Sequence, residues 1–181
     1  MIHPELEKLA APFERTSRII WGAFVFAPVI YSGLAWLLTQ GGERQLGDGQ
    51  FPADAIYIAV LLALLSGVIF PWVIAPRFIG PARMMQSSDM RPPTFEGEAA
   101  RIFERLGERD KARARMLGGV QAARIVRWAG AESVAIYGLL ALMMGVTDMY
   151  GAWAFSIAAI VLLTQLRPDY AGDLDQLDTS A

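Results

Sequence analysis

The chain has 181 residues, of which 54% are hydrophobic and 19% charged, and its formal net charge at pH 7 is −2. It has no cysteine and one histidine, which excludes disulfides, thiolate zinc sites, iron–sulfur clusters, thiol catalysis and bis-histidine haem within one chain. This composition, with a mean hydropathy of +0.35, favours a membrane protein over an ordinary globular domain. We expect no metal site and no cofactor.

Four apolar runs dominate the sequence, near residues 19–38, 56–74, 125–145 and 150–166. Each is long enough, or nearly so, to cross a hydrocarbon core of ~30 Å as a helix of ~20 residues. The runs are apolar on all sides, whereas helices of a soluble domain carry one apolar stripe. The sequence therefore predicts an all-α integral membrane protein with four spanning helices in two hairpins, joined by a helical cytoplasmic segment.

Positive charge divides unevenly between the two sides of these helices. All but one of the 16 Lys and Arg residues precede the first run, lie between Arg77 and Arg127, or follow the last run, and the exception is Arg44. The positive-inside rule then places the leader 1–18, the linker 77–120 and the tail 167–181 in the cytoplasm. All five tryptophans lie within about a turn of a predicted span end, where an indole N–H can stay in contact with water.

The leader 1–18 is the segment that a secretory signal would occupy. It carries three glutamates, and no small-residue cleavage site follows Leu38, so we expect a retained span. Its His3 is expected to be a solvated residue of a flexible leader.

The linker 77–120 is long enough for a soluble feature. Prolines interrupt its first half, but from Phe95 onward FEGEAARIFERLGERDKARARM has a helical pattern. Its apolar stripe comprises Ala99, Ile102, Phe103 and Leu106. Such a helix can lie on anionic lipid, or it can be a solvated helix packed against a neighbour or its own bundle. Its glutamates favour the second alternative. The basic cluster RDKARARM has no interleaved aromatic residues, so we expect no nucleic-acid partner.

An internal repeat is a further hypothesis. SRIIWGAFVFAPVIYSGLAWLL and ARIVRWAGAESVAIYGLLALMM align without gaps at an offset of 106 residues. The Arg18–Arg124 and Tyr31–Tyr137 pairs carry most of the match, and the alternative is a chance match of two apolar segments. A true repeat predicts a pseudo-twofold axis along the membrane normal.

Glu132 is an acid inside the third run, five residues beyond Arg127, or roughly 7 to 8 Å into the hydrocarbon. Burial disfavours its charged form, and an intramembrane acid usually meets a partner inside the bundle. One hypothesis is a glutamate that links two helices through Tyr31 or Ser32 of the first span. A second is an ion-exchanging carboxyl group, and a third is contact with an external partner. Small residues on the third run, Ala129, Ala131, Ala135 and Gly138, allow close approach of a helix from this chain or from another.

The stretch ESVAIYGLLA, residues 132–141, resembles the ion-binding helix of the c-type proteolipids of rotary ATP synthases. In that family a carboxylate followed by an AIYGL-like run carries a proton or a sodium ion in an oligomeric ring. The resemblance implies an ion-exchanging Glu132 on a helix that runs outward from the cytoplasm. The long linker, the cytoplasmic termini and the lack of a glycine stripe in 56–74 depart from the family pattern. The whole chain is similar to small four-helix bacterial inner-membrane proteins, which implies a location in the cytoplasmic membrane.

No residue pattern points to an enzyme. No serine or threonine has a base partner for nucleophilic catalysis, and GGERQLGDGQ lacks the lysine of a phosphate loop. We expect a membrane subunit or scaffold that associates with itself or with a larger membrane complex. The competing hypothesis is a proton- or cation-coupled transport component centred on Glu132. Pro28 and Pro71, which are expected to kink the first two spans, fit either function.

Overall fold

A computed structural model describes residues 4–40, 54–75 and 95–169, and within these ranges the chain is entirely helical. The helices are α1 (Pro4–Gln40), α2 (Ala55–Leu64), the π-helix η1 (Leu65–Ile74), α5 (Glu98–Arg105), α6 (Glu108–Met143) and α7 (Met149–Gln165). No strand occurs among the described residues. The predicted all-α fold class is confirmed.

Three of these helices are long and apolar enough to cross a membrane, namely α1, the continuous α2–η1 segment and α6. This finding supports the prediction of a membrane protein. The fourth predicted span corresponds to α7, which is apolar but has only 17 residues, slightly fewer than the ~20 that a perpendicular span needs. The count of four spans therefore stays a prediction.

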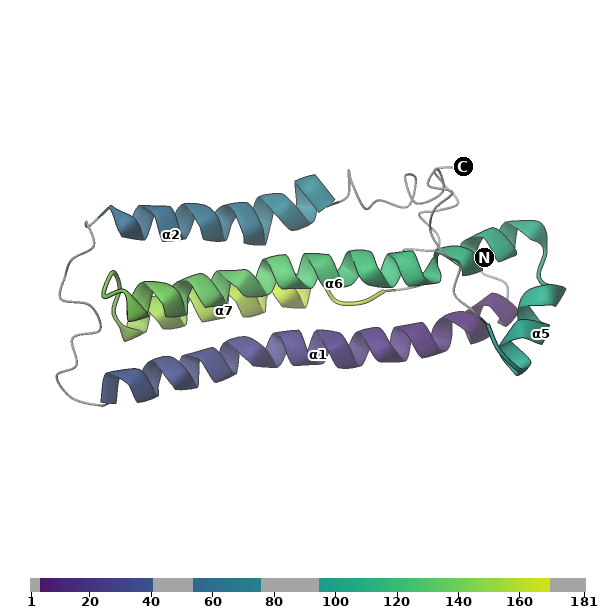
Figure 1. Cartoon of the computed structure of the whole chain (residues 1–181), viewed down its shortest axis with the longest axis horizontal. Helices are drawn as coiled ribbons and strands as arrows, with labels where there is room; N and C mark the ends of the chain where they lie inside the picture. Colours follow the sequence, from purple (N-terminus) through teal and green to yellow (C-terminus); the bar gives the residue numbers. More distant parts are fainter. Residues whose placement is uncertain (1–3, 41–53, 76–94, 170–181) are drawn as a thin grey trace.

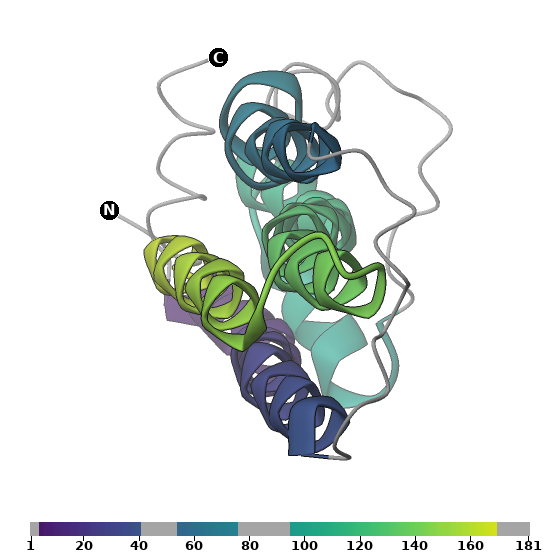
Figure 2. The same ribbon diagram turned by 90° about the vertical axis from the view of Figure 1, so that its left-hand side faces the viewer.

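Helix α6 lies at the centre of the arrangement, with α1, α2 and α7 around it (Figure 2). α1 and α6 run in one direction, and α2–η1 and α7 run in the other (Figure 1). α1 packs against α6 and α7, whereas α2–η1 packs mainly against α6. α1 and α2 are consecutive and antiparallel, but α6 lies between them. Only α6 and α7 form a closely packed hairpin among the described helices.

This packing does not follow the symmetry that the internal repeat predicts. A twofold axis relating α1 to α6 and α2–η1 to α7 would require α1 to pack against α2 as extensively as α6 packs against α7. The described residues show no comparable α1–α2 contact. The repeat is therefore not expressed as a symmetric bundle.

Two helices extend well beyond the predicted spans. α1 begins at Pro4 and includes nearly all of the leader 1–18, and α6 begins at Glu108, inside the linker 77–120. The flexible leader expected from the sequence is thus helical from Pro4 onward. Tertiary packing explains the extension, because a helix in water is stabilised mainly by the burial of an apolar face.

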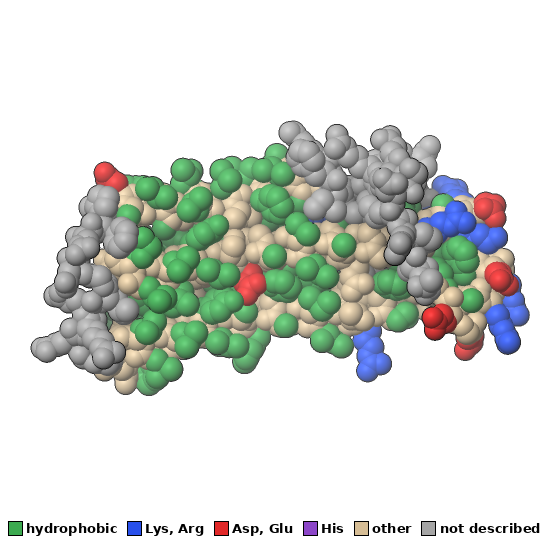
Figure 3. Space-filling model, in the orientation of Figure 1, with side chains coloured by type: hydrophobic (Ala, Val, Ile, Leu, Met, Phe, Trp, Pro, Cys, Tyr) green, Lys and Arg blue, Asp and Glu red, His purple; other side chains and the backbone are tan. Residues whose placement is uncertain are grey.

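That burial occurs in a small core, which we call the polar-end cluster. Its buried members come from α1, from the α5–α6 junction and from α6: Leu6, Leu9, Ala10, Leu106, Ala114, Met116, Leu117 and Val120. The stripe of α5 predicted from the sequence, including Phe103, packs against this core. α5 is therefore packed against its own chain, as the glutamate content favoured. Charged side chains gather around this end (Figure 3). Hydrophobic side chains cover the middle of the molecule, where α1, α2–η1, α6 and α7 lie together, and we call this region the apolar belt.

The two prolines expected to kink the spans behave differently. α1 continues through Pro28, which is fully buried. Pro71 lies inside η1, where the Ala75 backbone N–H donates to the Phe70 carbonyl five residues earlier. A π-helix has this wider spacing, and proline lacks the N–H that an α-helical bond would use. The second span thus accommodates its proline by widening its turns.

Candidate functional site

Glu132 and Tyr31 meet between α6 and α1. The Tyr31 hydroxyl donates a hydrogen bond of 2.7 Å to Glu132 Oε1, and both side chains are half-buried. The two helices run side by side in the same direction (Figures 1 and 2), so the bond joins residues far apart in the sequence. A hydrogen bond to a carboxyl oxygen lowers the cost of keeping that group in an apolar environment. The geometry ties the apolar part of α1 to the apolar part of α6.

Ser32, the other partner considered from the sequence, is not bonded to Glu132 through its hydroxyl. That hydroxyl donates to the Pro28 carbonyl one turn earlier in α1, at 2.9 Å. The Ser32 backbone carbonyl accepts a hydrogen bond of 3.2 Å from the Trp153 indole. Ser32 therefore joins α1 to α7, and Tyr31 joins α1 to α6.

The small residues of α6 are used inside the chain. Ala131, Ala135 and Gly138 are buried, whereas Ala129 is exposed. A Cβ atom added at Gly138 would lie 2.4 Å from Phe155 Cβ of α7, closer than any ordinary contact. The stripe predicted to allow close helix approach thus packs against helices of the same chain. It is not available to a second chain in this structure.

Two indole groups donate hydrogen bonds to backbone carbonyls at the end of α7. These bonds were not predicted from the sequence. Trp21 of α1 donates to the Leu163 carbonyl and Trp128 of α6 donates to the Leu166 carbonyl, each at 2.8 Å. The last carbonyls of a helix lack the regular partner four residues on. The Leu163 carbonyl also accepts a bond of 3.2 Å from the Leu166 N–H, and the two indoles supply further donors at this helix end. The expected water contact is therefore wrong for these two indoles and for Trp153, whose indole donates to the Ser32 carbonyl. The clue in the sequence is that Trp21 and Trp128 lie near the same predicted membrane edge.

Charges at the polar end form pairs with each other. Arg113 is 7% exposed and contacts Asp110 at 3.0 Å. Lys111 contacts Glu108 at 2.9 Å, and this hydrogen bond holds the pKa of the exposed Glu108 carboxyl below its ordinary value. The Arg115 guanidinium lies 5.8 Å from the centre of the Phe103 ring, within cation–π range. The polar end is thus a packed unit.

The site offers a hydrogen-bonded acid but no assembled metal site. Among residues 4–40, 54–75 and 95–169, no three His, Asp or Glu side chains converge in a group that could hold a metal ion. Glu132 can accept a hydrogen bond, as it does from Tyr31, or exchange a proton.

Comparison with known proteins adds no further information about the site. No family model, curated protein or solved structure matches this chain. The resemblances to c-type proteolipid helices and to small four-helix membrane proteins therefore carry forward only as proposals.

Proposed function

We propose that this protein is a non-enzymatic membrane subunit or scaffold of the bacterial cytoplasmic membrane. In this proposal α1, α2–η1, α6 and α7 all cross the bilayer, and both termini and the polar-end cluster lie in the cytoplasm. The three long apolar helices and the segregation of all but one of the Lys and Arg residues support this placement. The protein associates with itself or with a larger membrane complex.

The continuity of α1 and α6 is the observation that carries the proposal. These helices have 37 and 36 residues, or roughly 55 Å each at ~1.5 Å per residue, against ~30 Å for the hydrocarbon core. Both run without a break from the apolar belt into the polar-end cluster, and α5 packs against that cluster. A partner bound at that end would be held at a fixed height and orientation above the membrane. A scaffold needs this rigidity and needs no catalytic group.

The lateral surface provides a second means of association. Large hydrophobic side chains are exposed along α2–η1, including Tyr57 at 71%, Leu61 at 60% and Trp72 at 41%. A continuous row of exposed hydrophobic side chains on a soluble protein would favour aggregation. In a bilayer the same side chains contact lipid or other spanning helices. The Tyr31–Glu132 bond fits the same function, because it fixes the helices that extend toward the polar end.

Native mass measurement and site-specific crosslinking together test the scaffold proposal. A photo-crosslinking residue at Glu104, exposed on α5, should form an adduct in cells, and a matched residue at Tyr150, exposed at the opposite end, should not. The purified protein should then show an oligomer or a bound partner in mild detergent. A monomer in several detergents and in nanodiscs, with no adduct at Glu104, would contradict the proposal.

The half-exposed position of Glu132 favours one second candidate, a proton- or cation-coupled transport component. A carboxyl group that reaches the surface of the apolar belt can exchange an ion with a neighbouring subunit or with a water-filled path. Glu132→Gln should then preserve the fold and abolish proton- or cation-dependent flux in reconstituted vesicles. Full flux in this variant, or no flux from the unmodified protein under any gradient, would remove this candidate.

A further inference from the structure

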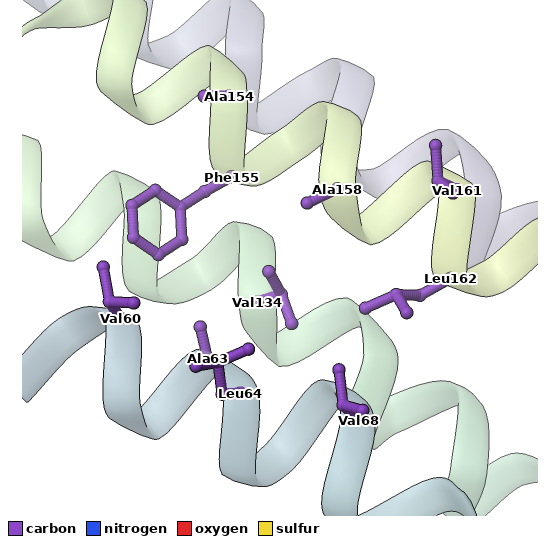
Figure 4. A pocket seen from close by; sticks show the side chains of 10 residues that line it. All are labelled: Val60, Ala63, Leu64, Val68, Val134, Ala154, Phe155, Ala158, Val161 and Leu162. Carbon is purple, nitrogen blue, oxygen red and sulfur yellow. The ribbon is translucent and has the colours of Figure 1, made fainter.

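A long groove separates α2–η1 from α7 on one side of α6. It has a volume of about 470 Å³ and is lined only by apolar residues from the three helices. Val60, Leu64 and Val68 form one wall, and Ala154, Phe155, Ala158, Val161 and Leu162 form the other; Ala63 and Val134 complete the lining (Figure 4). Ala154 and Ala158 have small side chains, so they leave space on the α7 side of the groove.

The groove exists because α2–η1 touches α6 along a narrow line. The buried residues of this segment recur every fourth position and are small or cyclic: Ala63, Gly67, Pro71 and, just beyond η1, Ala75. A Cβ atom at Gly67 would lie 2.3 Å from Val134 Cγ2, and one at Gly130 would lie 2.8 Å from the Ser66 carbonyl. These glycines bring the backbones together at the line of contact. Few contacts join η1 to α7, so the space between them stays open.

An apolar chain is the occupant that this lining accepts. A water molecule needs two to four polar partners, and none of the lining side chains has a polar atom. The groove opens sideways in the apolar belt, where the proposed bilayer supplies hydrocarbon tails. An occupant that fills it would also support α2–η1, which packs against α6 but has few contacts with α7.

The cytoplasmic edge of the groove carries groups that suit a phosphate. Arg127 precedes Val134 by two helical turns and so lies on the same face of α6. Arg167 is exposed and lies two residues beyond Gln165, the last residue of α7. Trp72, four residues beyond Val68 on η1, is 41% exposed, as is usual for an indole at a membrane interface. Basic groups between spans on the cytoplasmic side bind anionic head groups.

We propose that the groove between α2–η1 and α7 binds one acyl chain of an anionic phospholipid whose phosphate lies near Arg127 and Arg167. This inference rests on the proposed membrane placement. It assigns a specific lipid site to the proposed membrane protein. The groove binds the acyl chain, and the positive charges of Arg127 and Arg167 attract the head group. The bound lipid would act as a structural part of the bundle.

Native mass spectrometry of lipid retention tests the acyl-chain site. The protein is inserted into nanodiscs of equal parts phosphatidylglycerol and phosphatidylcholine and then released gently. One phosphatidylglycerol should be retained per chain, and Ala158→Trp, which fills the groove, should reduce retention to background. Ala23→Trp, at an exposed position of α1 away from the groove, should retain the lipid. Equal retention by the Ala158→Trp variant and the parent would overturn the site.

The head-group assignment has its own variants in the same experiment. Arg127→Gln and Arg167→Gln should each reduce the preference for phosphatidylglycerol over phosphatidylcholine by about fivefold, the value of one basic residue near an anionic surface. An unchanged preference in both variants would overturn the anionic assignment. Failure of the parent protein to enter nanodiscs would instead contradict the membrane placement, so the two proposals fail in distinguishable ways.

Discussion

The polar-end cluster and the apolar belt share α1 and α6 but are packed in different ways. Leucine, methionine and valine make up most of the buried residues at the polar end, as Leu6, Leu117 and Val120 illustrate. Alanine and glycine predominate in the belt, where Ala131, Ala135 and Gly138 are buried. Many of the large side chains of the belt point outward, including Phe26 at 62% and Ile157 at 63% exposure. Both α1 and α6 thus pack through large side chains at the polar end and through small residues in the apolar belt.

The proposed membrane placement accounts for the difference. In water, burial of large apolar side chains is the main source of stability. In lipid, the surrounding tails are as apolar as leucine, so helices associate through close backbone approach and interhelical hydrogen bonds. The bonds from Tyr31 to Glu132, from Trp21 to Leu163 and from Trp153 to Ser32 are of this second kind. The packing of the two regions therefore agrees with a bilayer around the belt and water around the polar end.

The largest expected effect concerns leucine truncation. Leu117→Ala, at 0% exposure in the polar-end cluster, should reduce the free energy of unfolding by ~2–5 kcal/mol because it leaves a cavity. The control Leu61→Ala, at 60% exposure on α2, should change it by less than about 0.5 kcal/mol. Denaturant unfolding in mild detergent measures both. Equal losses would mean that the two regions are not packed differently.

Glycine substitution gives the next largest effect. Gly138→Ala places a Cβ atom against Phe155 and should reduce the free energy of unfolding by ~1–3 kcal/mol through overpacking. At Gly33 a Cβ atom meets nothing within 4 Å, so Gly33→Ala should raise it by up to ~1 kcal/mol through helix propensity. Thermal unfolding of both variants decides the matter, and effects of the same sign would remove close backbone approach as the packing principle of the belt.

A smaller effect is expected from the bond between α1 and α6. Tyr31→Phe removes the hydroxyl that donates to Glu132 and should cost ~0.6–1.7 kcal/mol, the range of interhelical bonds in membranes. Combining it with Glu132→Ala, which removes the acceptor, in a double-mutant cycle isolates the pair. Tyr57→Phe, at 71% exposure on α2, serves as the control. Strictly additive effects of the two substitutions would show that the bond contributes nothing.

The smallest effect belongs to the surface of the polar end. Lys111→Gln removes the bond that keeps the pKa of Glu108 low, so this pKa should rise toward its ordinary value. A lowered carboxyl pKa favours the folded state above the ordinary pKa, and the contribution disappears as pH falls through the lowered value. Because Glu108 is exposed, overall stability should hardly change. An NMR titration of Glu108 measures the shift, and an unchanged pKa would count against the pair.

The helix type of each apolar run could be predicted from that run alone, and these segments are helical. The contact between Tyr31 and Glu132 joins two distant segments, and the sequence offered Tyr31 only as one of two alternative partners. The extension of α1 to Pro4 was missed because the charged leader looks solvated until α5 and α6 are placed beside it. The position of α2 against α6 was also inaccessible, since a helix that is apolar all round gives no preferred face. Only the close contacts at Gly67 and Gly130 reveal it.

The most direct test of the account is the sidedness of the two ends of the long helices. The native chain has no cysteine, so single cysteines at Ala112 and Gln40 react without background. Both positions are exposed, Ala112 near the start of α6 and Gln40 at the end of α1. The start of α6 and the end of α1 lie at opposite ends of the molecule (Figure 1). With an impermeant thiol reagent on intact cells, the cysteine at Gln40 should react at once, and the one at Ala112 should react only after the membrane is opened. Labelling of both from the same side would contradict a membrane-spanning belt with a cytoplasmic polar end.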